Sequence, residues 1–361
     1  MVNLSDTIAV IHETVAPIGL PRYATTITQQ KPRVFEIWVP LLGGLALLIA
    51  GGDLLVRGAV RVASRLGVSP LVIGLTLVGF GTSTPELVTS VNAALGGAPG
   101  IAYGNIVGSN IANILLIVGA SAILFPIAVT SAALKRDGAV MIAITVGFAA
   151  LAALMPMARW LGAVFVAALA SYVYVAFRQE RQSVAAAGHS AVYDKSLALQ
   201  EADPGTAPRD PAAGSILVAL VIAIGGLVLI LLGGTFLVDG AVALAQSFGI
   251  SETVIGLTIV ALGTSLPEFV TSVLAAIRRQ SDVAFGNIVG SNIYNILGIG
   301  GITALIAPGA VPAEIVSFDN LVMIGVSVLL VAFAWTGLRI ARIEGMALLA
   351  GYLLYVFVVW P

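Results

Sequence analysis

Long apolar stretches separated by short polar breaks run along most of the chain. Many are about 18 residues or longer, enough to cross a hydrocarbon layer of ~30 Å as an α-helix. No segment shows the alternating pattern of a membrane β-barrel strand. The pattern therefore predicts an all-α polytopic membrane protein with ten transmembrane helices, at roughly 36–57, 69–95, 101–124, 136–154, 159–177, 215–246, 251–277, 282–306, 320–337 and 342–360.

Two less apolar segments lie outside these spans. Residues 1–35 are a predicted extracytoplasmic N-terminal tail. Segment 8–20 lacks the basic start of a signal peptide, and an interfacial helix is the alternative for this segment. Residues 178–214 are rich in Ala, Ser, Asp, Gln and Pro, which is typical of a flexible polar linker. We therefore expect one helical unit over 36–177 and another over 215–361.

One part of the chain recurs almost unchanged. At a constant offset of 182 residues, 67–113 matches 249–295 with 29 identities in 47 positions and no gap. GLTLVGFGTSTPELVTSV (74–91) returns as GLTIVALGTSLPEFVTSV (256–273). A shared Gly- and Ala-rich composition cannot explain polar residues that recur at the same spacing. We infer that the protein contains two copies of one five-helix repeat.

The charges predict that the two repeats are inverted. A unit of five spans forces the second copy to enter the membrane from the opposite side. The first predicted helix ends with Arg57, Arg61 and Arg65, and the second unit has no arginine at the equivalent positions. In this topology 13 of the 17 Lys and Arg fall on the side that holds the linker. Since positive residues favour the cytoplasm, we expect a cytoplasmic linker and both termini outside. Inverted repeats are typical of secondary transporters, with the substrate site near the midplane.

The composition excludes several other classes of protein. The chain is 59% hydrophobic and 10% charged, with a mean hydropathy of +1.05, whereas soluble domains carry roughly 25% charged residues. A net charge of −1 argues against a nucleic-acid partner, and the absence of cysteine excludes thiolate and disulfide chemistry. His12 and His189 lie outside the apolar spans. No nucleophile–base pair or cofactor loop is visible, so we expect neither an enzyme nor a cofactor.

Two acidic residues stand out within the spans. Glu86 and Glu268 occupy equivalent positions in the two copies, in the middle of apolar stretches. An ionisable residue at this depth is costly and is functional by default; the alternative is a structural glutamate bonded to a neighbouring helix. Pro85 and Pro267 interrupt the helices and free carbonyls one turn earlier. Irregular backbone at this depth lines a protein cavity. The candidate ligands around it are the carbonyls near Gly79–Thr82 and Ala261–Thr264 and the hydroxyls of Thr82, Ser83, Thr264 and Ser265.

A second repeated motif lies in the third and eighth spans, as YGNIVGSNIAN (103–113) and FGNIVGSNIYN (285–295). Gly108 and Gly290 would permit close helix approach or a local break. The polar members are Ser109 with Asn113 and Ser291 with Asn295, each pair on one helix face, together with Asn105, Asn110, Asn287 and Asn292. Interhelical hydrogen bonding is the alternative to a ligand role, above all for Asn105 and Asn287.

These side chains offer only oxygen ligands, namely carboxylates, hydroxyls, amides and carbonyls. Such a set suits hard cations and does not suit zinc or copper. Magnesium dehydrates reluctantly and requires a rigid octahedron, so a cage of this kind fits calcium better. Two carboxylates also balance the charge of one Ca²⁺.

The sequences GTSTPELVTS and GTSLPEFVTS, each followed by GNIVGSN, resemble the two α-repeats of the sodium/calcium exchangers. The resemblance covers about 40–125 and 220–305 closely. It implies a ten-helix exchanger of prokaryotic type, without the calcium-sensing domains of animal members, that exchanges about three Na⁺ for one Ca²⁺.

Carried across by motif position, the resemblance also implies the site residues. Glu86 and Glu268 would bind calcium together with the carbonyls of Thr82 and Thr264. Sodium would use Ser83, Ser265, Ser109, Ser291 and the carbonyls of Gly79 and Ala261, and Asn113 and Asn295 would line the central site. Potassium-dependent relatives carry aspartate at one of these two asparagine positions, which argues against potassium co-transport here.

The expected function is secondary active antiport of Na⁺ and Ca²⁺ in the plasma or inner membrane, with the lipid bilayer as the surroundings. A monomer is compatible with the sequence, which leaves the oligomeric state open. A proton-coupled exchanger for Ca²⁺ or another divalent cation is the main alternative, although its relatives place the acidic residue in a GNxxE context. A channel or a membrane scaffold is a more distant alternative, because neither requires an inverted pair.

Overall fold

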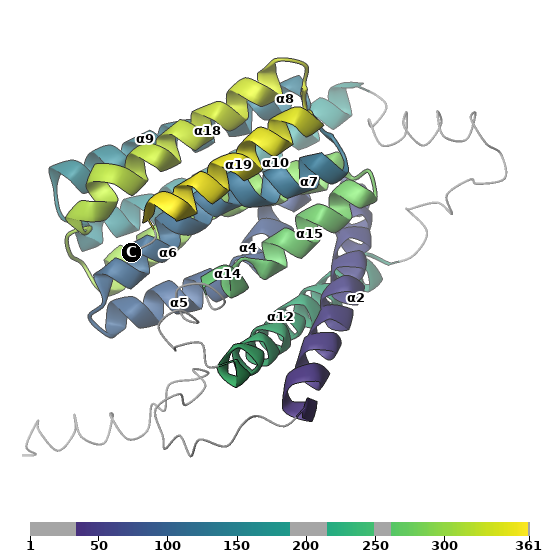
Figure 1. The fold of residues 1–361 in the computed structure, drawn as a ribbon. Coiled ribbons are helices and arrows are strands. Elements are labelled where there is room, and N and C mark those ends of the chain that lie inside the picture. The colour runs from purple at the N-terminus through teal and green to yellow at the C-terminus, as the bar shows by residue number, and fades with distance from the viewer. Residues whose placement is uncertain (1–33, 188–214, 249–260, 360–361) are drawn as a thin grey trace, which may run out of the picture.

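The structure is a computed structural model that describes residues 34–187, 215–248 and 261–359 (Figure 1). Within these residues, eight helices and one bent helix pair are long and apolar enough to cross a membrane. The predicted tail up to residue 33, most of the predicted linker, and the first ten residues of the seventh predicted span lie outside the described ranges. The remaining predicted spans all appear as helices.

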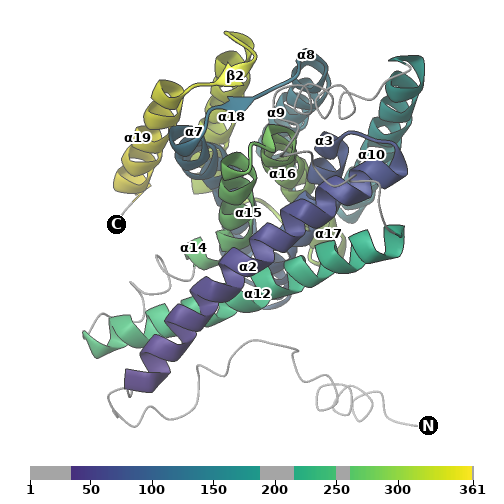
Figure 2. The ribbon, with the colours of Figure 1, turned by 90° about the vertical axis from the view of Figure 1, so that its right-hand side faces the viewer.

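The two longest helices, α2 (Val34–Leu66) and α12 (Ile216–Ser247), lie side by side along one side of the molecule (Figures 1 and 2). Glycines spaced by seven residues form their contact. A Cβ atom on Gly51 would lie 2.7 Å from the Gly226 carbonyl, and one on Gly233 would lie 2.8 Å from the Leu48 nitrogen. Small residues let membrane helices approach closely enough for their backbones to pack. The repeat-equivalent seam positions are Gly44, Gly51 and Gly58 on α2, and Gly226, Gly233 and Gly240 on α12.

Two broken helices lie between this pair and the helices α9 (Ala139–Leu154), α18 (Asn320–Trp335) and α19 (Arg342–Val359) (Figure 1). In the first, Pro70–Thr82 and Thr84–Leu95 meet at a bend of 46°. The break falls at Ser83, close to Pro85 as predicted, because Pro85 has no backbone N–H to continue the helix. The elements are α3 (Pro70–Ile73), η1 (Gly74–Val78), α4 (Gly79–Thr82) and α5 (Thr84–Leu95), and in the second repeat α14 (Ala261–Thr264) and α15 (Leu266–Ile277).

Two largely buried helices, α6 (Pro99–Ala112) and α16 (Ser281–Tyr294), continue through π-helical turns that begin at Asn113 and Asn295. The close approach predicted for Gly290 is confirmed, since a Cβ atom there would collide with the carbonyl of Leu75. Around Gly108, no atom of the described residues lies within 4 Å of such a Cβ position, apart from its chain neighbours and the nearby backbone of its own helix. π-Turns often mark functional sites. The turns are η2 (Asn113–Val118) and η6 (Asn295–Ile299), followed by α7 (Gly119–Leu124) and α17 (Gly300–Ile306).

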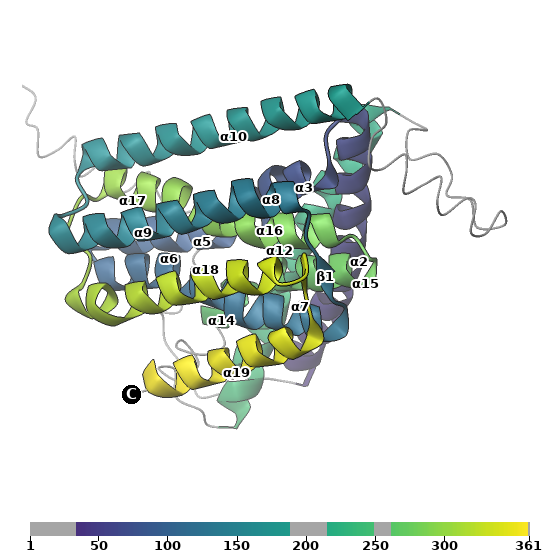
Figure 3. The ribbon, with the colours of Figure 1, turned by 90° about the horizontal axis from the view of Figure 1, so that it is seen from above.

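The remaining helices form the outer part of the fold, with α10 and α19 along opposite edges when it is seen from above (Figure 3). Each of these two packs on a helix of the other repeat, α10 on α17 and α19 on α7. These outer elements are α8 (Ser131–Ala133), η3 (Leu134–Gly138), α9 (Ala139–Leu154), α10 (Arg159–Ala187), η7 (Ile315–Asp319), α18 (Asn320–Trp335) and α19 (Arg342–Val359).

The loops show that the repeats are inverted. Strand β1 (Ile127–Ala128), before α9, pairs antiparallel with β2 (Arg339–Ile340), between α18 and α19. After α9, Met157 forms a bridge to Gly309. Position 309 is the repeat equivalent of 127, yet it lies at the opposite end of α9. Equivalent loops therefore lie on opposite faces of the molecule.

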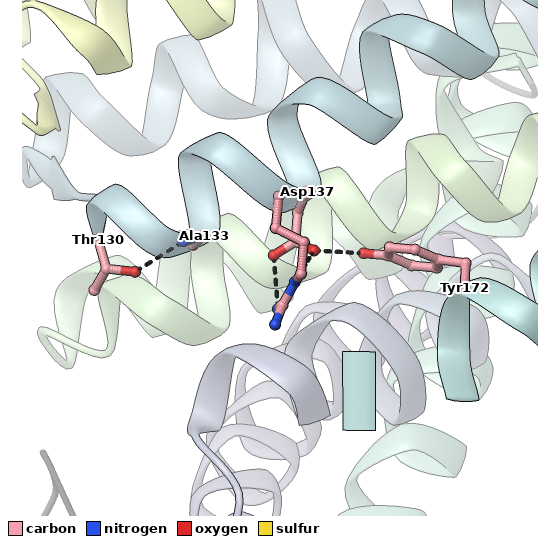
Figure 4. A network of polar contacts seen from close by, with 5 residues as sticks. Thr130, Ala133, Asp137 and Tyr172 are labelled. Atoms are coloured by element: carbon pink, nitrogen blue, oxygen red, sulfur yellow. Dashed lines mark hydrogen bonds and ion pairs between the residues drawn. The ribbon is translucent and has the colours of Figure 1, made fainter. Parts of the chain in front are cut away.

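A carboxylate ties the outer helices together in each repeat, Asp137 being fully buried and Asp319 partly buried. Asp137, in η3, accepts a hydrogen bond of 3.0 Å from the hydroxyl of Tyr172 on α10 (Figure 4). Arg136 bonds the same carboxylate at 2.7 Å. In the second repeat, Tyr355 on α19 donates to Asp319 at 2.9 Å. Both repeats thus join their fourth and fifth helices through one Asp–Tyr pair.

Two predicted helix ends differ in the structure. The first span was expected to end at residue 57, but α2 continues to Leu66. The polar linker was expected to begin at residue 178, but α10 continues as helix to Ala187. Residues 178–182 are Arg, Gln, Glu, Arg and Gln. Long unbranched side chains of this kind are good helix formers, so the helix extends beyond its apolar span.

Candidate cation site

The two helix breaks bring the repeats together at their serines. Ser83, at the break between α4 and α5, donates a hydrogen bond of 2.7 Å to Oε1 of Glu268. Ser265, at the break between α14 and α15, donates one of 3.0 Å to Oε1 of Glu86. Each serine therefore bonds the glutamate of the other repeat, and the two carboxylates lie across one shared site.

Both glutamates lie in the first turn of a helix, Glu86 in α5 and Glu268 in α15. The N-terminal end of a helix carries a partial positive charge that favours an anion. Each residue is only 1% exposed, so neither points into lipid. The second oxygen of each, Oε2, is buried and meets no hydrogen-bond donor within the described ranges. Each glutamate thus has one oxygen held by serine and one oxygen left over.

Two asparagines add further acceptor oxygens. Asn113 donates through Nδ2 to Oδ1 of Asn292 at 3.0 Å, and Asn295 donates through Nδ2 to Oγ of Ser109 at 2.9 Å. The Oδ1 atoms of Asn113 and Asn295 are buried, and no donor from the part of the chain that the structure describes reaches them. Native proteins rarely leave buried polar atoms without a partner. Two carboxylate and two amide oxygens share this property here.

A second pair of asparagines braces the broken helices. Asn105 donates to the backbone carbonyl of Glu86 at 3.0 Å and to Ser90 at 2.9 Å. Asn287 makes the equivalent bonds to the Glu268 carbonyl at 3.2 Å and to Ser272 at 2.8 Å. The interhelical alternative considered for Asn105 and Asn287 is therefore what the structure shows. These amides hold the backbone of the glutamates.

The hydroxyls around the first break are already engaged. Thr82, which is fully buried, donates to the Val78 carbonyl at 3.0 Å and lies 3.2 Å from Oδ1 of Asn287. Ser291 donates to the Gly79 carbonyl at 3.1 Å. That carbonyl also accepts the Ser83 N–H at 3.2 Å. A cation at Gly79 would therefore share this oxygen with protein donors.

The other predicted residues have varied positions. Ser109 is buried and donates to the Asn105 carbonyl at 2.6 Å. Thr264 is partly buried at the end of α14, and Ala261 begins that helix. Hydrogen bonds therefore link the serines to the glutamates and asparagines, while Thr264 and Ala261 lie in the adjoining short helix.

Two serines of this cluster were absent from the sequence-based candidates, and Asn292 was a motif member without an assigned partner. Ser90 and Ser272 anchor the bracing amides, and Asn292 holds Asn113. The signal that could have found the two serines is their recurrence at the 182-residue offset. Asn292 recurs too, as Asn110, but a bond to the other repeat cannot be read from one sequence.

The donor set points to a hard cation. Within the described residues no three His, Cys, Asp or Glu side chains gather as a conventional metal cluster. Hydroxyl, amide and carboxylate oxygens do gather, and these are the ligands that Ca²⁺ and Na⁺ take in proteins. An inverted pair of helical repeats with acidic residues at its centre defines the class of membrane ion transporters.

Comparisons with known proteins agree with this class. The family described as "Sodium/calcium exchanger protein" matches residues 36–178 and 218–360. The putative antiporter CaxA of Alkalimonas amylolytica is 39% identical over 89% of this chain and 97% of its own length. The sodium/calcium exchanger MaX1 of Methanosarcina acetivorans is 36% identical over the same shares. A solved structure of the sodium-calcium exchanger NCX_Mj, soaked with 10 mM Na⁺ and zero Ca²⁺, has a TM-score of 0.76 at 31% identity and covers 91% of this chain and 100% of that one.

The chain therefore belongs to the sodium/calcium exchanger family. It is a multi-pass membrane ion exchanger of the prokaryotic type, and not an enzyme. The predicted all-α fold of two inverted five-helix repeats is confirmed. At the level of the family, its activity is exchange of a cation for Ca²⁺.

Proposed function

We propose that this protein exchanges Na⁺ for Ca²⁺ by alternating access and that Glu86 and Glu268 bind the calcium ion together. The observation that carries the proposal is the crosswise pairing, in which each serine at a helix break bonds the glutamate of the other repeat. The pairing leaves one buried carboxylate oxygen on each glutamate free to bind a cation.

The charges favour a divalent ion at this position. Two carboxylates taken out of water cost several kcal/mol each when unpaired, and they also repel one another. One Ca²⁺ between them would cancel both charges. The amide oxygens of Asn113 and Asn295 would extend the ligand set toward the six to eight oxygens that Ca²⁺ prefers.

Sodium would use an overlapping set of oxygens. The candidates are Ser83, Ser265, Ser109, Ser291, Thr82 and Thr264, with the carbonyls of Gly79 and Ala261. The Ser83 and Ser265 hydroxyls now donate to the glutamates, and an oxygen that donates its proton still offers lone pairs to Na⁺. Because the two ions would share the glutamates, they would compete, and about three Na⁺ would replace one Ca²⁺.

The two negative charges of the empty site make the exchange obligatory. An empty site with two facing carboxylates resists closure, whereas a site loaded with Ca²⁺ or with several Na⁺ closes and can open on the other side. The repeats would move relative to each other around the site. Only loaded forms would cross, so efflux of one ion would drive influx of the other.

We further propose that the linker is cytoplasmic and that both termini lie outside. Arg57 and Arg278, from different repeats, both form ion pairs with Asp53. The turn of α2 that holds Asp53 and Arg57 and the start of the 278–282 hairpin therefore lie on one side, which supports a cytoplasmic position for both. Because the chain has no cysteine, a single cysteine placed at position 195 would report the side of the linker through a membrane-impermeant reagent.

The coupling ion is tested by ⁴⁵Ca²⁺ flux in proteoliposomes, with Na⁺, K⁺ and H⁺ gradients imposed one at a time. We expect Ca²⁺ uptake to follow an outward Na⁺ gradient at fixed pH and to be unaffected by K⁺. Uptake driven by a pH gradient in the absence of Na⁺ would identify a proton-coupled exchanger instead. Release of calcium at the same rate without any counter-cation would contradict obligatory exchange.

A further inference from the structure

The two site asparagines raise a question of orientation. A side-chain amide has an oxygen at one end and an NH₂ group at the other, and the two ends have nearly the same shape. Only the oxygen can bind a cation. A half-turn of the Asn113 or Asn295 amide would therefore replace an ion ligand with a donor that repels the ion. Something in the protein has to set the direction of each amide.

For Asn295 the direction is set by Ser109. The Ser109 hydroxyl donates to the Asn105 carbonyl at 2.6 Å, so its proton is engaged. The Ser109 oxygen can then only accept, and it accepts Nδ2 of Asn295 at 2.9 Å. The amide oxygen of Asn295 is left without a protein donor among the described residues. This residue already belongs to the predicted site.

For Asn113 the direction is set by Asn292, on α16 of the other repeat. Asn292 is 1% exposed, and its Oδ1 accepts Nδ2 of Asn113 at 3.0 Å. Its own NH₂ group lies 3.8 Å from the sulfur of Met141, a buried residue of α9. If both amides turned over, the oxygen of Asn292 would face the sulfur, and two acceptors would meet. The sulfur therefore favours the arrangement in which the Asn113 oxygen is left for the cation.

This arrangement occurs on one side only. The repeat equivalent of Asn292 is Asn110, which donates to the Ile106 carbonyl of its own helix at 2.6 Å. The asparagine equivalent to Asn113, Asn295, is held by Ser109 instead. Asn110 thus supplies a matched control of the same residue type, burial and repeat position.

We propose that Asn292, supported by Met141, is a positioning residue that turns the amide oxygen of Asn113 toward the cation site and thereby strengthens Ca²⁺ binding. The inference rests on the proposed function, because it assumes that Asn113 is a calcium ligand. Asn292 itself does not touch the ion. Its effect passes through one hydrogen bond to a ligand from the other repeat.

The test compares Asn292→Leu with Asn110→Leu in proteoliposomes and in detergent. Loss of one buried hydrogen bond corresponds to roughly a tenfold change in affinity. We expect Asn292→Leu to raise the half-saturating Ca²⁺ concentration roughly tenfold, with a smaller change in maximal rate. Asn110→Leu should change it less than about twofold. Equal half-saturating Ca²⁺ concentrations for Asn292→Leu and the wild type would overturn the proposal.

A second background separates positioning from a general structural defect. Asn113→Asp presents a carboxylate oxygen at both ends, so its direction no longer matters. In that background Asn292→Leu should change calcium half-saturation by less than about twofold. An equal loss in both backgrounds would mean that Asn292 only supports the fold, and the proposal would fail.

Met141→Leu gives a milder version that keeps the apolar volume, and it serves if Asn292→Leu yields no folded protein. It should weaken Ca²⁺ binding two- to threefold in the wild type and leave Ca²⁺ binding by Asn113→Asp unchanged. No effect in the wild type would overturn the supporting role of Met141. Equilibrium ⁴⁵Ca²⁺ binding to the wild type distinguishes the two levels of the account. The absence of saturable binding would contradict the proposed function. If the wild type binds Ca²⁺ and both Asn292→Leu and Met141→Leu bind it with the same affinity, only the positioning role would be contradicted.

Discussion

The two repeats are alike in their glutamate layer and different in their asparagine layer. Ser83 bonds Glu268 and Ser265 bonds Glu86, so the acidic layer is mirrored across the molecule. In contrast, Asn113 is held by an asparagine and Asn295 by a serine. We conclude that the duplication supplies a symmetric charge, while residues that are identical in the two copies hold the neutral ligands differently.

The largest expected effect tests whether the two glutamates contribute equally to Ca²⁺ binding. Glu86→Gln and Glu268→Gln should each lower Ca²⁺ transport roughly a hundredfold or more, because a neutral amide cannot offset the ion's charge in a dry site. Glutamine keeps an acceptor for the opposite serine, so the fold should survive. Flux measured on both folded variants checks this. A large loss of flux in one variant and near wild-type flux in the other would contradict equal roles for Glu86 and Glu268.

The glycine seam between α2 and α12 is mirrored as well. Gly51→Ala and Gly233→Ala occupy equivalent positions, and in each the new methyl group would lie under 3 Å from backbone of the facing helix. We expect each to destabilise the protein by about 1–3 kcal/mol, since overpacked contacts cost this much. Thermal unfolding in detergent gives the values. The control is Gly225→Ala, an exposed position with no atom of the described residues within 4 Å; equal melting temperatures for all three would contradict the seam.

Loss of Asn287 should destabilise the protein more than loss of Asn105. Asn287 is fully buried and holds both the Glu268 carbonyl and Ser272, whereas Asn105 is only partly buried. Asn287→Ala should therefore cost about 1–3 kcal/mol of stability, and Asn105→Ala less. Both should reduce calcium flux less than the glutamate variants do. A larger loss for Asn105→Ala than for Asn287→Ala would reverse this order.

The smallest expected effect is at Asp319, and it emerges from a comparison of the two Asp–Tyr pairs of the outer helices. Asp137 is fully buried and bonds both Arg136 and Tyr172, so Asp137→Asn should lower stability by about 1–3 kcal/mol. Asp319→Asn keeps an acceptor for Tyr355 and should cost less than about 1 kcal/mol. Melting curves of the two variants provide the test, and similar losses would show that Arg136 adds nothing to the first pair.

The sequence predicted the features that repeat or depend on periodicity. The helical spans, the break at Ser83 and the acidic centre follow from apolar length, from Pro85 and from the 182-residue offset. It could not predict contacts between repeats, because spacing along a helix does not say which partner lies opposite. The crosswise Ser83–Glu268 bond is one example, and the bond between Asn113 and Asn292 is another. Hydropathy also missed the continuation of α10, since that extension rests on helix propensity and carries no apolar signal.

The most direct measurement of the central claim is equilibrium ⁴⁵Ca²⁺ binding to the purified protein, with Na⁺ added as competitor. We expect one calcium ion per chain, displaced by Na⁺, and lost when either Glu86 or Glu268 alone is changed to glutamine. Two independent calcium ions per chain, or full binding in either single variant, would show that the repeats do not share one site.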